Sequence, residues 1–269
     1  METEGLVLTI WGEEKTGKTS LALTFPKPLI HFDLDIGGFN RARWRVDTKE
    51  VKSTPYFSED VLQKLLKGDL TIRPSHKVYG MKELWTKIIT EYAHALLDKE
   101  AATIVIDSGT QLWSICHSAV LQEKQEMQIL KNPKIQDADL RERLQPIEYG
   151  EPNKRMRALI SAAHGYKKIL VLTHYPRDIY VTKMMGDRAE EVKSGEIEPD
   201  GFKENRRLTD LEVKTFMKVV PNTTGKGTHK VPSCRITLSG LTLDAVDIEL
   251  EPNYDKIIEV VNALRGEAS

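Results

Sequence analysis

Short runs of apolar residues, several of them ending in a polar or acidic side chain, recur through the first two thirds of the chain. They occupy residues Leu6–Trp11, Leu29–Asp35, Ala101–Asp107 and Lys168–Thr173. Runs of this length are typical of strands that are buried on both faces of a sheet. We therefore predict four buried strands.

Between these runs the apolar positions recur every three or four residues, as they do on one face of a helix. The segments with this spacing are Ser20–Leu23, Ser58–Leu66, Met81–Leu97, Gly109 to about Leu130, and Asn153–His164. Strands that alternate with helices predict a mostly parallel sheet covered by helices, which is an α/β fold.

The last third of the chain follows a different pattern. Thr182–Leu208 has few large apolar residues and predicts a long surface loop or a hairpin. Glu212–Val220 and Ser233–Ser239 predict an antiparallel pair of strands, and Asn253–Leu264 predicts a closing amphipathic helix. We expect one domain over residues 1–269, with mobile excursions at about 131–152, which is charged and interrupted by prolines, and at 182–208.

The composition fits a globular domain with one sizeable core. The chain has 269 residues, of which 40% are hydrophobic and 29% are charged. The formal net charge of −1 argues against a uniformly basic nucleic-acid binder. A local basic patch can still contact phosphates, so the distribution of charge matters more than its sum.

Cysteine usage and hydropathy indicate the compartment. Cys116 and Cys234 lack the spacing of a metal or redox motif, and we interpret both as buried thiols in a reducing environment. No window approaches the roughly 18 apolar residues of a membrane span. We expect a cytoplasmic protein, in the host cytoplasm if it is viral, with no membrane partner.

Residues Gly12–Thr19 read Gly-Glu-Glu-Lys-Thr-Gly-Lys-Thr, which is the phosphate-binding loop pattern G-x-x-x-x-G-K-[ST] between a strand and a helix. The glycines let the backbone curl so that successive N–H groups point at phosphate oxygens, and the following helix presents the positive end of its dipole. The residues expected to hold the nucleotide are Gly12, Glu13, Glu14, Lys15, Thr16, Gly17, Lys18, Thr19 and Ser20. The sequence thus predicts that the chain binds a nucleoside triphosphate.

Strand ends supply the rest of the predicted chemistry. Lys18 is expected to reach the β- and γ-phosphates, while Thr19 and Asp107 hold Mg²⁺. Asp35, at the end of the strand after the loop helix, is our candidate for the group that positions the attacking water. Asp33 alternates with Asp35 and points to the opposite face, and capping of the following Gly-Gly turn is the alternative role for one or both carboxylates.

A histidine ends the strand that follows the Asp107 strand. His174 is placed where a polar side chain could contact the γ-phosphate and relay its presence to the adjoining loop. We therefore include His174 among the catalytic candidates. A purely structural role is the alternative for a single histidine at a strand end.

Basic residues concentrate in one part of the chain. Between Phe202 and Arg235 there are eight Lys and Arg residues against three acids. This region is either a solvated face or a groove for single-stranded DNA, in which flexible loops carry Lys and Arg and Phe202 could stack on a base. The residues expected to bind DNA are Lys203, Arg206, Arg207, Lys226 and Lys230.

The phosphate loop and three strand ends together resemble the RecA-like ATPases. The strand ends are Phe32–Gly38, Val105–Ser108 and Leu172–His174. In particular, the chain resembles the compact bacteriophage nucleotide-binding proteins that contain a RecA core without flanking domains and act as single-strand annealing recombinases. The resemblance extends from about Gly5 to Leu250. In that family a Glu usually occupies the position of Asp35. The polar residue that senses phosphate at a strand end, where recombinases often carry Asn-Gln, falls on His174 or, as the alternative, on Tyr175.

The resemblance implies a RecA-like P-loop NTPase core, and an ATP- and Mg²⁺-dependent ATPase that acts in DNA recombination or strand annealing. Because Asp is shorter than Glu, hydrolysis is expected to be slow, and DNA is expected to stimulate it. The resemblance also implies single-stranded DNA bound by loops after the His174 strand, and a homo-oligomeric ring or filament with ATP between subunits. A Lys or Arg would be donated across that interface. The candidate donors are Lys214, Lys218, Lys226 and Lys230.

Two other function classes remain open at this point. A small-molecule phosphotransferase would use Asp139–Leu144 as an arginine-bearing lid, with Asp33 and Asp35 binding the acceptor. A non-hydrolysing protein would use the nucleotide as an assembly switch. The chain contains no Asn-Lys-x-Asp guanine-recognition motif, which disfavours a GTPase.

Overall fold

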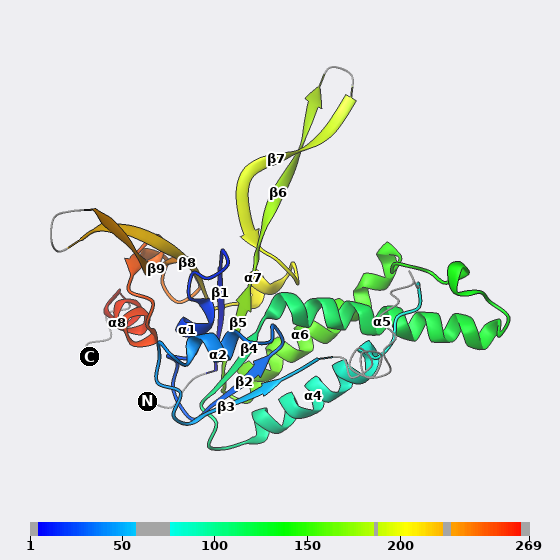
Figure 1. Ribbon diagram of the computed structural model, residues 1–269, viewed down its shortest axis with the longest axis horizontal. Coiled ribbons are helices and arrows are strands. Elements are labelled where there is room, and N and C mark those ends of the chain that lie inside the picture. The colour runs from blue at the N-terminus through cyan, green and yellow to red at the C-terminus, as the bar shows by residue number, and fades with distance from the viewer. Residues whose placement is uncertain (1–4, 58–75, 186–187, 223–226, 265–269) are drawn as a thin grey trace.

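The computed structural model describes residues 5–57, 76–185, 188–222 and 227–264. Its main sheet has the strand order β10-β9-β8-β1-β5-β4-β2-β3 (Figure 1). The strands that run parallel are β1 (Leu6–Gly12), β2 (Leu29–Asp33), β3 (Val51–Pro55), β4 (Thr103–Asp107), β5 (Ile169–His174) and β8 (Leu211–Pro221). The antiparallel strands are β9 (Thr228–Ser239) and β10 (Glu249–Leu250). The predicted α/β fold with a mostly parallel sheet, and with antiparallel strands toward the C-terminus, is confirmed.

Successive residues of the buried strands face two separate hydrophobic cores. In β4, Ile104 and Ile106 belong to one core and Val105 to the other, as the two-residue period of a strand requires. The first core contains residues of α4 (Met81–Leu97), α5 (Gly109–Lys131) and α6 (Gly150–Gly165). The second contains residues of α1 (Lys18–Ala22), α2 (Gly38–Ala42) and α8 (Tyr254–Leu264). Helices therefore cover both faces of the sheet.

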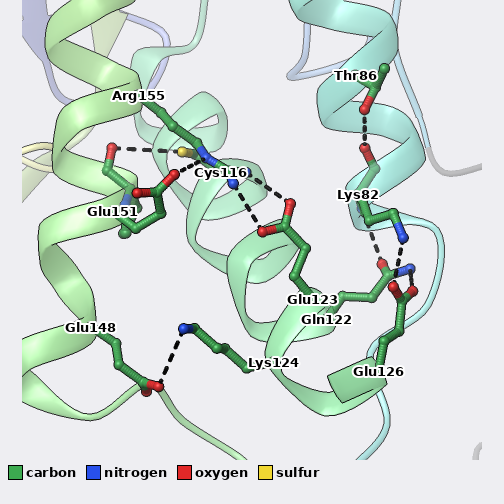
Figure 2. A network of polar contacts seen from close by, with 11 residues as sticks. Lys82, Thr86, Cys116, Gln122, Glu123, Lys124, Glu126, Glu148, Glu151 and Arg155 are labelled. Carbon is green, nitrogen blue, oxygen red and sulfur yellow. Dashed lines mark hydrogen bonds and ion pairs between the residues drawn. The ribbon is translucent and has the colours of Figure 1, made fainter. Parts of the chain in front are cut away.

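Polar contacts join the three helices of the first face (Figure 2). Lys82 of α4 bonds Glu126 of α5 at 2.6 Å, and Arg155 of α6 bonds Glu123 of α5 at 2.9 Å. Because solvent screens such partly exposed pairs, each contributes little to stability. Their role is to fix how α4 and α6 lie against α5, while the apolar core supplies most of the stability.

Two hairpins project from the molecule. Strands β6 (Pro176–Met185) and β7 (Arg188–Pro199) form a separate antiparallel sheet that extends well away from the body (Figure 1). The hairpin alternative for the 182–208 segment is thus confirmed, with an earlier start at Pro176 and a short helix α7 (Asn205–Leu208) after it. Strands β8 and β9 form the second hairpin, as predicted, and β8 continues beyond the last residue that it pairs with β1.

Some elements differ from the sequence-based expectations. The edge strand β3 was not predicted, because its residues are half-buried or exposed and form no apolar run. The mobility of the segment 131–152 stays a prediction; the segment contains the 3-10 turns η1 (Asp137–Asp139) and η2 (Pro146–Tyr149), and an ion pair of 2.6 Å joins Arg141 to Glu148. The helix predicted at Ser58–Leu66 lies outside the described residues.

Cys116 and Cys234 are both free and buried, as predicted, and burial raises the pKa of each thiol to about 12.

In the described part of the chain, no helix combines the length and the apolar character that a membrane crossing needs.

The parallel strands align their carboxyl ends at one edge of the sheet. The register pairs Asp33 of β2 with Asp107 of β4, and Trp11 of β1 with His174 of β5. The loop that begins at Gly12 leaves from this same edge. The fold thus gathers the predicted phosphate loop and the predicted acidic strand ends in one place.

Candidate nucleotide-binding site

A cleft of about 340 Å³ opens at the carboxyl edge of the sheet. The predicted residues that line it are Glu14, Lys15, Gly17, Lys18, Thr19, Ser20, Asp35 and Asp107. Five other residues also line the cleft. They are Tyr175, which follows β5, and Gly38, Arg41, Ala42 and Arg45 of the segment after β2. Gly12, Glu13 and Thr16 belong to the loop but do not face the cleft.

The loop backbone is shaped by its glycines and fastened to β8. Gly12 and Gly17 have φ values of 149° and 98°, a range that L side chains rarely adopt. A Cβ on Gly12 would lie 2.2 Å from the Thr215 carbonyl oxygen, so only glycine fits there. The Thr16 hydroxyl lies 2.8 Å from the Glu13 carbonyl oxygen and 2.7 Å from the Thr215 hydroxyl. These contacts hold the loop in a curled shape.

Lys18 folds back over the loop. Its Nζ donates to the carbonyl oxygens of Gly12 and Glu13 at 2.8 and 2.9 Å, and lies 4.8 Å from the centre of the Tyr175 ring. Burial lowers the pKa of Lys18, although the nearby charges of Asp107 and Asp35 oppose that effect. A partly desolvated ammonium of this kind gains more from an anionic ligand than one in water does.

Thr19 and Asp107 meet at the predicted magnesium position. The Thr19 hydroxyl donates to Asp107 Oδ2 at 2.6 Å, and the Thr173 hydroxyl donates to Asp107 Oδ1. The imidazole of His31 lies 3.6 Å from the same carboxylate. Burial alone would raise the pKa of Asp107, but the interactions with His31, Thr173 and Thr19 outweigh it and hold that pKa below its ordinary value. The carboxylate and the hydroxyl are hard oxygen donors of the kind that Mg²⁺ prefers.

The two acids after β2 have different surroundings. Asp33 is buried and its Oδ2 accepts the Gly37 N–H at 3.2 Å, which fits the turn-capping role. Asp35 is half-buried in the cleft, and its Oδ2 accepts a hydrogen bond from the Tyr175 hydroxyl. Burial raises the pKa of Asp35, partly offset by that hydrogen bond. Of the two, only Asp35 can face a bound phosphate.

His174 lies outside the cleft. Its ring is buried between Gly109 and Gly201, and its nitrogens contact the Asp200 carbonyl oxygen at 2.7 Å and the Asn205 side chain at 3.2 Å. Burial lowers the pKa of His174 to about 4, so the ring is neutral near pH 7. The structure does not bring His174 to the phosphate position. Tyr175 lies there instead, because consecutive residues at a strand end point to opposite sides.

The predicted DNA-binding residues fall on two separate elements. Arg206, in α7, bonds the buried Glu212 at 2.9 Å, and Arg207 is largely exposed. Lys203 lines a shallow hollow at the base of the β6–β7 hairpin. Lys230 is exposed on β9, and Lys226 lies outside the described residues.

The structure does not support two roles suggested from the sequence, namely base stacking by Phe202 and a lid at Asp139–Leu144. Phe202 is only 4% exposed and packs 5.6 Å from the Trp113 ring, so it cannot stack on a base. The guanidinium of Arg141, the proposed lid residue, is bonded to Glu148, and the Arg141 carbonyl oxygen accepts from Gln125 of α5. Residues Asp139–Leu144 contribute nothing to the cleft lining.

Sequence reasoning missed Arg41 and Arg45. Both line the cleft on the wall formed by α2 and the residues after it. Their signal in the sequence is a pair of arginines four residues apart, which is the spacing of neighbours on one helix face, directly after the Gly37–Gly38 turn.

The geometry agrees with the comparison to known families. A model of the AAA domain family matches residues 4–222, which is more than half of the chain. No curated protein matches the sequence. The matched range contains the phosphate loop, Asp35, Asp107 and Tyr175, which are the residues that meet in the cleft. The chain therefore belongs to the AAA domain family and is a P-loop NTPase.

Proposed function

We propose that this protein is an ATP- and Mg²⁺-dependent ATPase that binds single-stranded DNA and acts in recombination or strand annealing. We propose ATP hydrolysis because Lys18, the Thr19–Asp107 pair and Asp35 converge in one cleft. Phosphoryl transfer depends mainly on positioning and on charge stabilisation, and these residues supply both.

Each residue has a defined role in this proposal. Lys18 exchanges the carbonyl oxygens of Gly12 and Glu13 for phosphate oxygens when the nucleotide binds. Thr19 and Asp107 hold Mg²⁺, which when bound neutralises charge on the phosphoryl group. Asp35 in its ionised form orients the attacking water. Because Asp35 is already half-buried and bonded to Tyr175, hydrolysis in the absence of DNA is slow.

Tyr175 takes over the sensing role that the sequence suggested for His174. Its hydroxyl bonds Asp35, its ring lies against Lys18, and its backbone continues directly into β6 at Pro176. A ligand that moves Lys18 or Asp35 would therefore change the contacts of the residue from which the β6–β7 hairpin starts. His174 keeps a structural role at the base of this connection.

The positive charge of the β8–β9 hairpin supports the proposed binding of single-stranded DNA. Residues 211–239 contain five Lys and Arg residues and one acid. Glu249 neutralises part of this charge, since it pairs with Lys218 at 2.6 Å and with Arg235 at 3.7 Å. Lys230 is exposed on the same hairpin, where it can reach a phosphate backbone. Lys203, at the base of the other hairpin, is the second described residue that we assign to DNA.

The proposal includes a ring or filament with ATP between subunits. Among the candidate donors of a charge across the interface, Lys214 lies 4.8 Å from the centre of the Trp11 ring and Lys218 is bonded to Glu249. The ATP-dependent change in mass, measured by sedimentation, tests this assembly.

The test of the ATPase is Mg²⁺-dependent ATP hydrolysis with and without single-stranded DNA. Lys18→Ala exposes contaminating activity, and Lys99→Ala, an exposed lysine before β4 at the opposite edge of the sheet, is the matched control. We expect turnover that DNA stimulates, that Lys18→Ala abolishes and that Lys99→Ala retains. ADP formation only in the presence of a small acceptor would instead indicate a phosphotransferase. Tight ATP binding without turnover would indicate an assembly switch.

A further inference from the structure

One wall of the cleft carries two arginines that lie outside the phosphate loop. Arg41 in α2 and Arg45, in the turn that follows, both line the cleft together with Ala42 between them. A hydrogen bond of 2.8 Å from the Arg45 N–H to the Ala42 carbonyl oxygen closes this turn. Lys15 and Lys18 line the same cleft. Two separate segments of the chain therefore contribute cations to the cleft.

A close approach of Gly38 to Asp107 and Thr19 fixes the position of this wall. A Cβ on Gly38 would lie 2.9 Å from Asp107 Oδ2 and 3.2 Å from the Thr19 hydroxyl oxygen, so the start of α2 touches the predicted magnesium position. Arg41 folds back toward that end, since its Nη1 would lie 3.2 Å from a Cβ built on Gly37. The guanidinium of Arg41 is thus held beside the residues that contact phosphate and metal.

Among the residues that the structure describes, no acid neutralises either arginine. No carboxylate in the described ranges lies within ion-pair distance of Arg41 or Arg45. The nearby acids Asp35 and Asp107 are engaged by Tyr175 and by threonine hydroxyls instead. Two like charges on one cleft wall attract an anion more strongly than either charge alone does.

We propose that Arg41 and Arg45 bind phosphate oxygens of the nucleoside triphosphate, in addition to the phosphate loop and within the same subunit. This inference rests on the proposed nucleotide-binding function. Guanidinium groups suit the role, because their planar donors form paired, charge-assisted hydrogen bonds with phosphate. The two arginines would add to Lys18 a stabilisation of phosphate charge that needs no donor from a neighbouring subunit.

The same segment offers a matched control. Arg43 lies between the two arginines in sequence and is also exposed, but it does not line the cleft. Its guanidinium lies 5.3 Å from the centre of the Trp44 ring. A variant of Arg43 therefore removes the same charge from the same segment without touching the cleft.

The test is equilibrium binding of a non-hydrolysable ATP analogue and of AMP to Arg41→Ala, Arg45→Ala, Arg41→Lys and Arg43→Ala. We expect Arg41→Ala and Arg45→Ala each to weaken binding of the triphosphate by about 10- to 100-fold, since a hydrogen bond to a charged group contributes on this scale. Binding of AMP should weaken less, Arg41→Lys should recover part of the loss, and Arg43→Ala should bind as the unsubstituted protein does.

Three results would overturn the inference. Triphosphate affinity that is unchanged in both Arg41→Ala and Arg45→Ala refutes it while leaving the proposed function intact. Loss of single-stranded DNA binding with normal nucleotide binding would assign this wall to DNA. If the unsubstituted protein binds no nucleotide, the proposed function itself fails and the inference fails with it. Thermal unfolding shows that the variants are folded, which is expected because both side chains are exposed.

Discussion

The Tyr175 hydroxyl donates a hydrogen bond to the carboxylate of Asp35, and the two side chains share one wall of the nucleotide cleft. Tyr175 also covers Lys18 with its ring. One tyrosine therefore contacts both the proposed water-orienting acid and the proposed phosphate-binding lysine. These contacts lead to a prediction about pH.

Tyr175→Phe should move the acid limb of the pH–activity profile to higher pH. Burial raises the pKa of Asp35, and the Tyr175 hydrogen bond lowers it. Asp35 acts as the ionised form, so activity falls as pH decreases through its pKa. Loss of the hydroxyl raises that pKa further, while the ring that covers Lys18 is kept. The rate of ATP hydrolysis measured against pH checks this, with Tyr180→Phe on the exposed part of β6 as the control. An unmoved acid limb would remove Asp35 from the chemistry.

Gly38→Ala should impair magnesium-dependent activity. The added methyl group would press on Asp107 Oδ2 and the Thr19 hydroxyl, at 2.9 and 3.2 Å. We expect the Mg²⁺ concentration for half-maximal hydrolysis to rise by about tenfold or more, as for disturbed metal surroundings elsewhere. Gly165→Ala at the end of α6 is the control, because a Cβ there meets nothing within 4 Å. An equal effect of both substitutions would show that the close approach is unimportant.

Thr173→Val should destabilise the fold by about 1–3 kcal/mol, because one oxygen of the buried Asp107 loses its hydroxyl donor. Urea unfolding measures the change. Thr103→Val is the matched control, since the buried Thr103 hydroxyl has no hydrogen-bond partner in the described residues, and its removal should cost little. Equal losses from the two substitutions would contradict the assigned contact.

The contact between Thr173 and Asp107 also predicts how the free energy of unfolding depends on pH. The pKa of Asp107 is below its ordinary value in the folded protein. Its contribution to the free energy of unfolding is therefore complete above the unfolded pKa of about 3.9 and is lost as pH falls through the folded pKa. The stability difference between Thr173→Val and the unsubstituted protein should accordingly shrink in acid. Urea titrations at several pH values check this.

Replacement of Lys226 and Lys230 together should weaken binding of single-stranded DNA. Each lost phosphate contact should also reduce the slope of log affinity against log salt by about 0.7. ATP affinity should stay nearly intact, because Lys230 does not line the cleft. Lys99 and Lys131, replaced together, are the control for the loss of two positive charges. DNA binding that is unchanged in both double variants would remove the β8–β9 hairpin from the DNA site.

The sequence predicted the parts of the fold that burial dictates. Strands β1, β4 and β5 were found because every residue in them, apart from Leu6, is buried and most are apolar. The edge strand β3 and the polar β6–β7 hairpin have no such pattern, since most of their side chains meet water rather than a core. Their pairing depends on backbone hydrogen bonds, which leave no pattern in the side chains.

The residues of the candidate site were likewise predicted only in part. The phosphate loop, Asp35 and Asp107 came from motifs with a fixed spacing, and they meet in the cleft. The choice between His174 and Tyr175 depends on which way the last residue of β5 faces, and the register with β1 and β4 decides that. Arg41 could have been recognised from its spacing with Arg45, but the wall that they form depends on how Gly38 approaches β4.

Because Tyr175 passes directly into β6, a backbone rotation at Tyr175 would swing the hairpin with its pivot at the cleft. No loop separates Tyr175 from Pro176, where the strand begins, and the strand continues to Met185. Ten residues at about 3.3 Å each give an arm of about 33 Å, so a rotation of about 5° at the pivot displaces the far end by about 3 Å. Rearrangements in the cleft that are smaller than a bond length would thus become displacements comparable to the size of a water molecule, well away from the nucleotide.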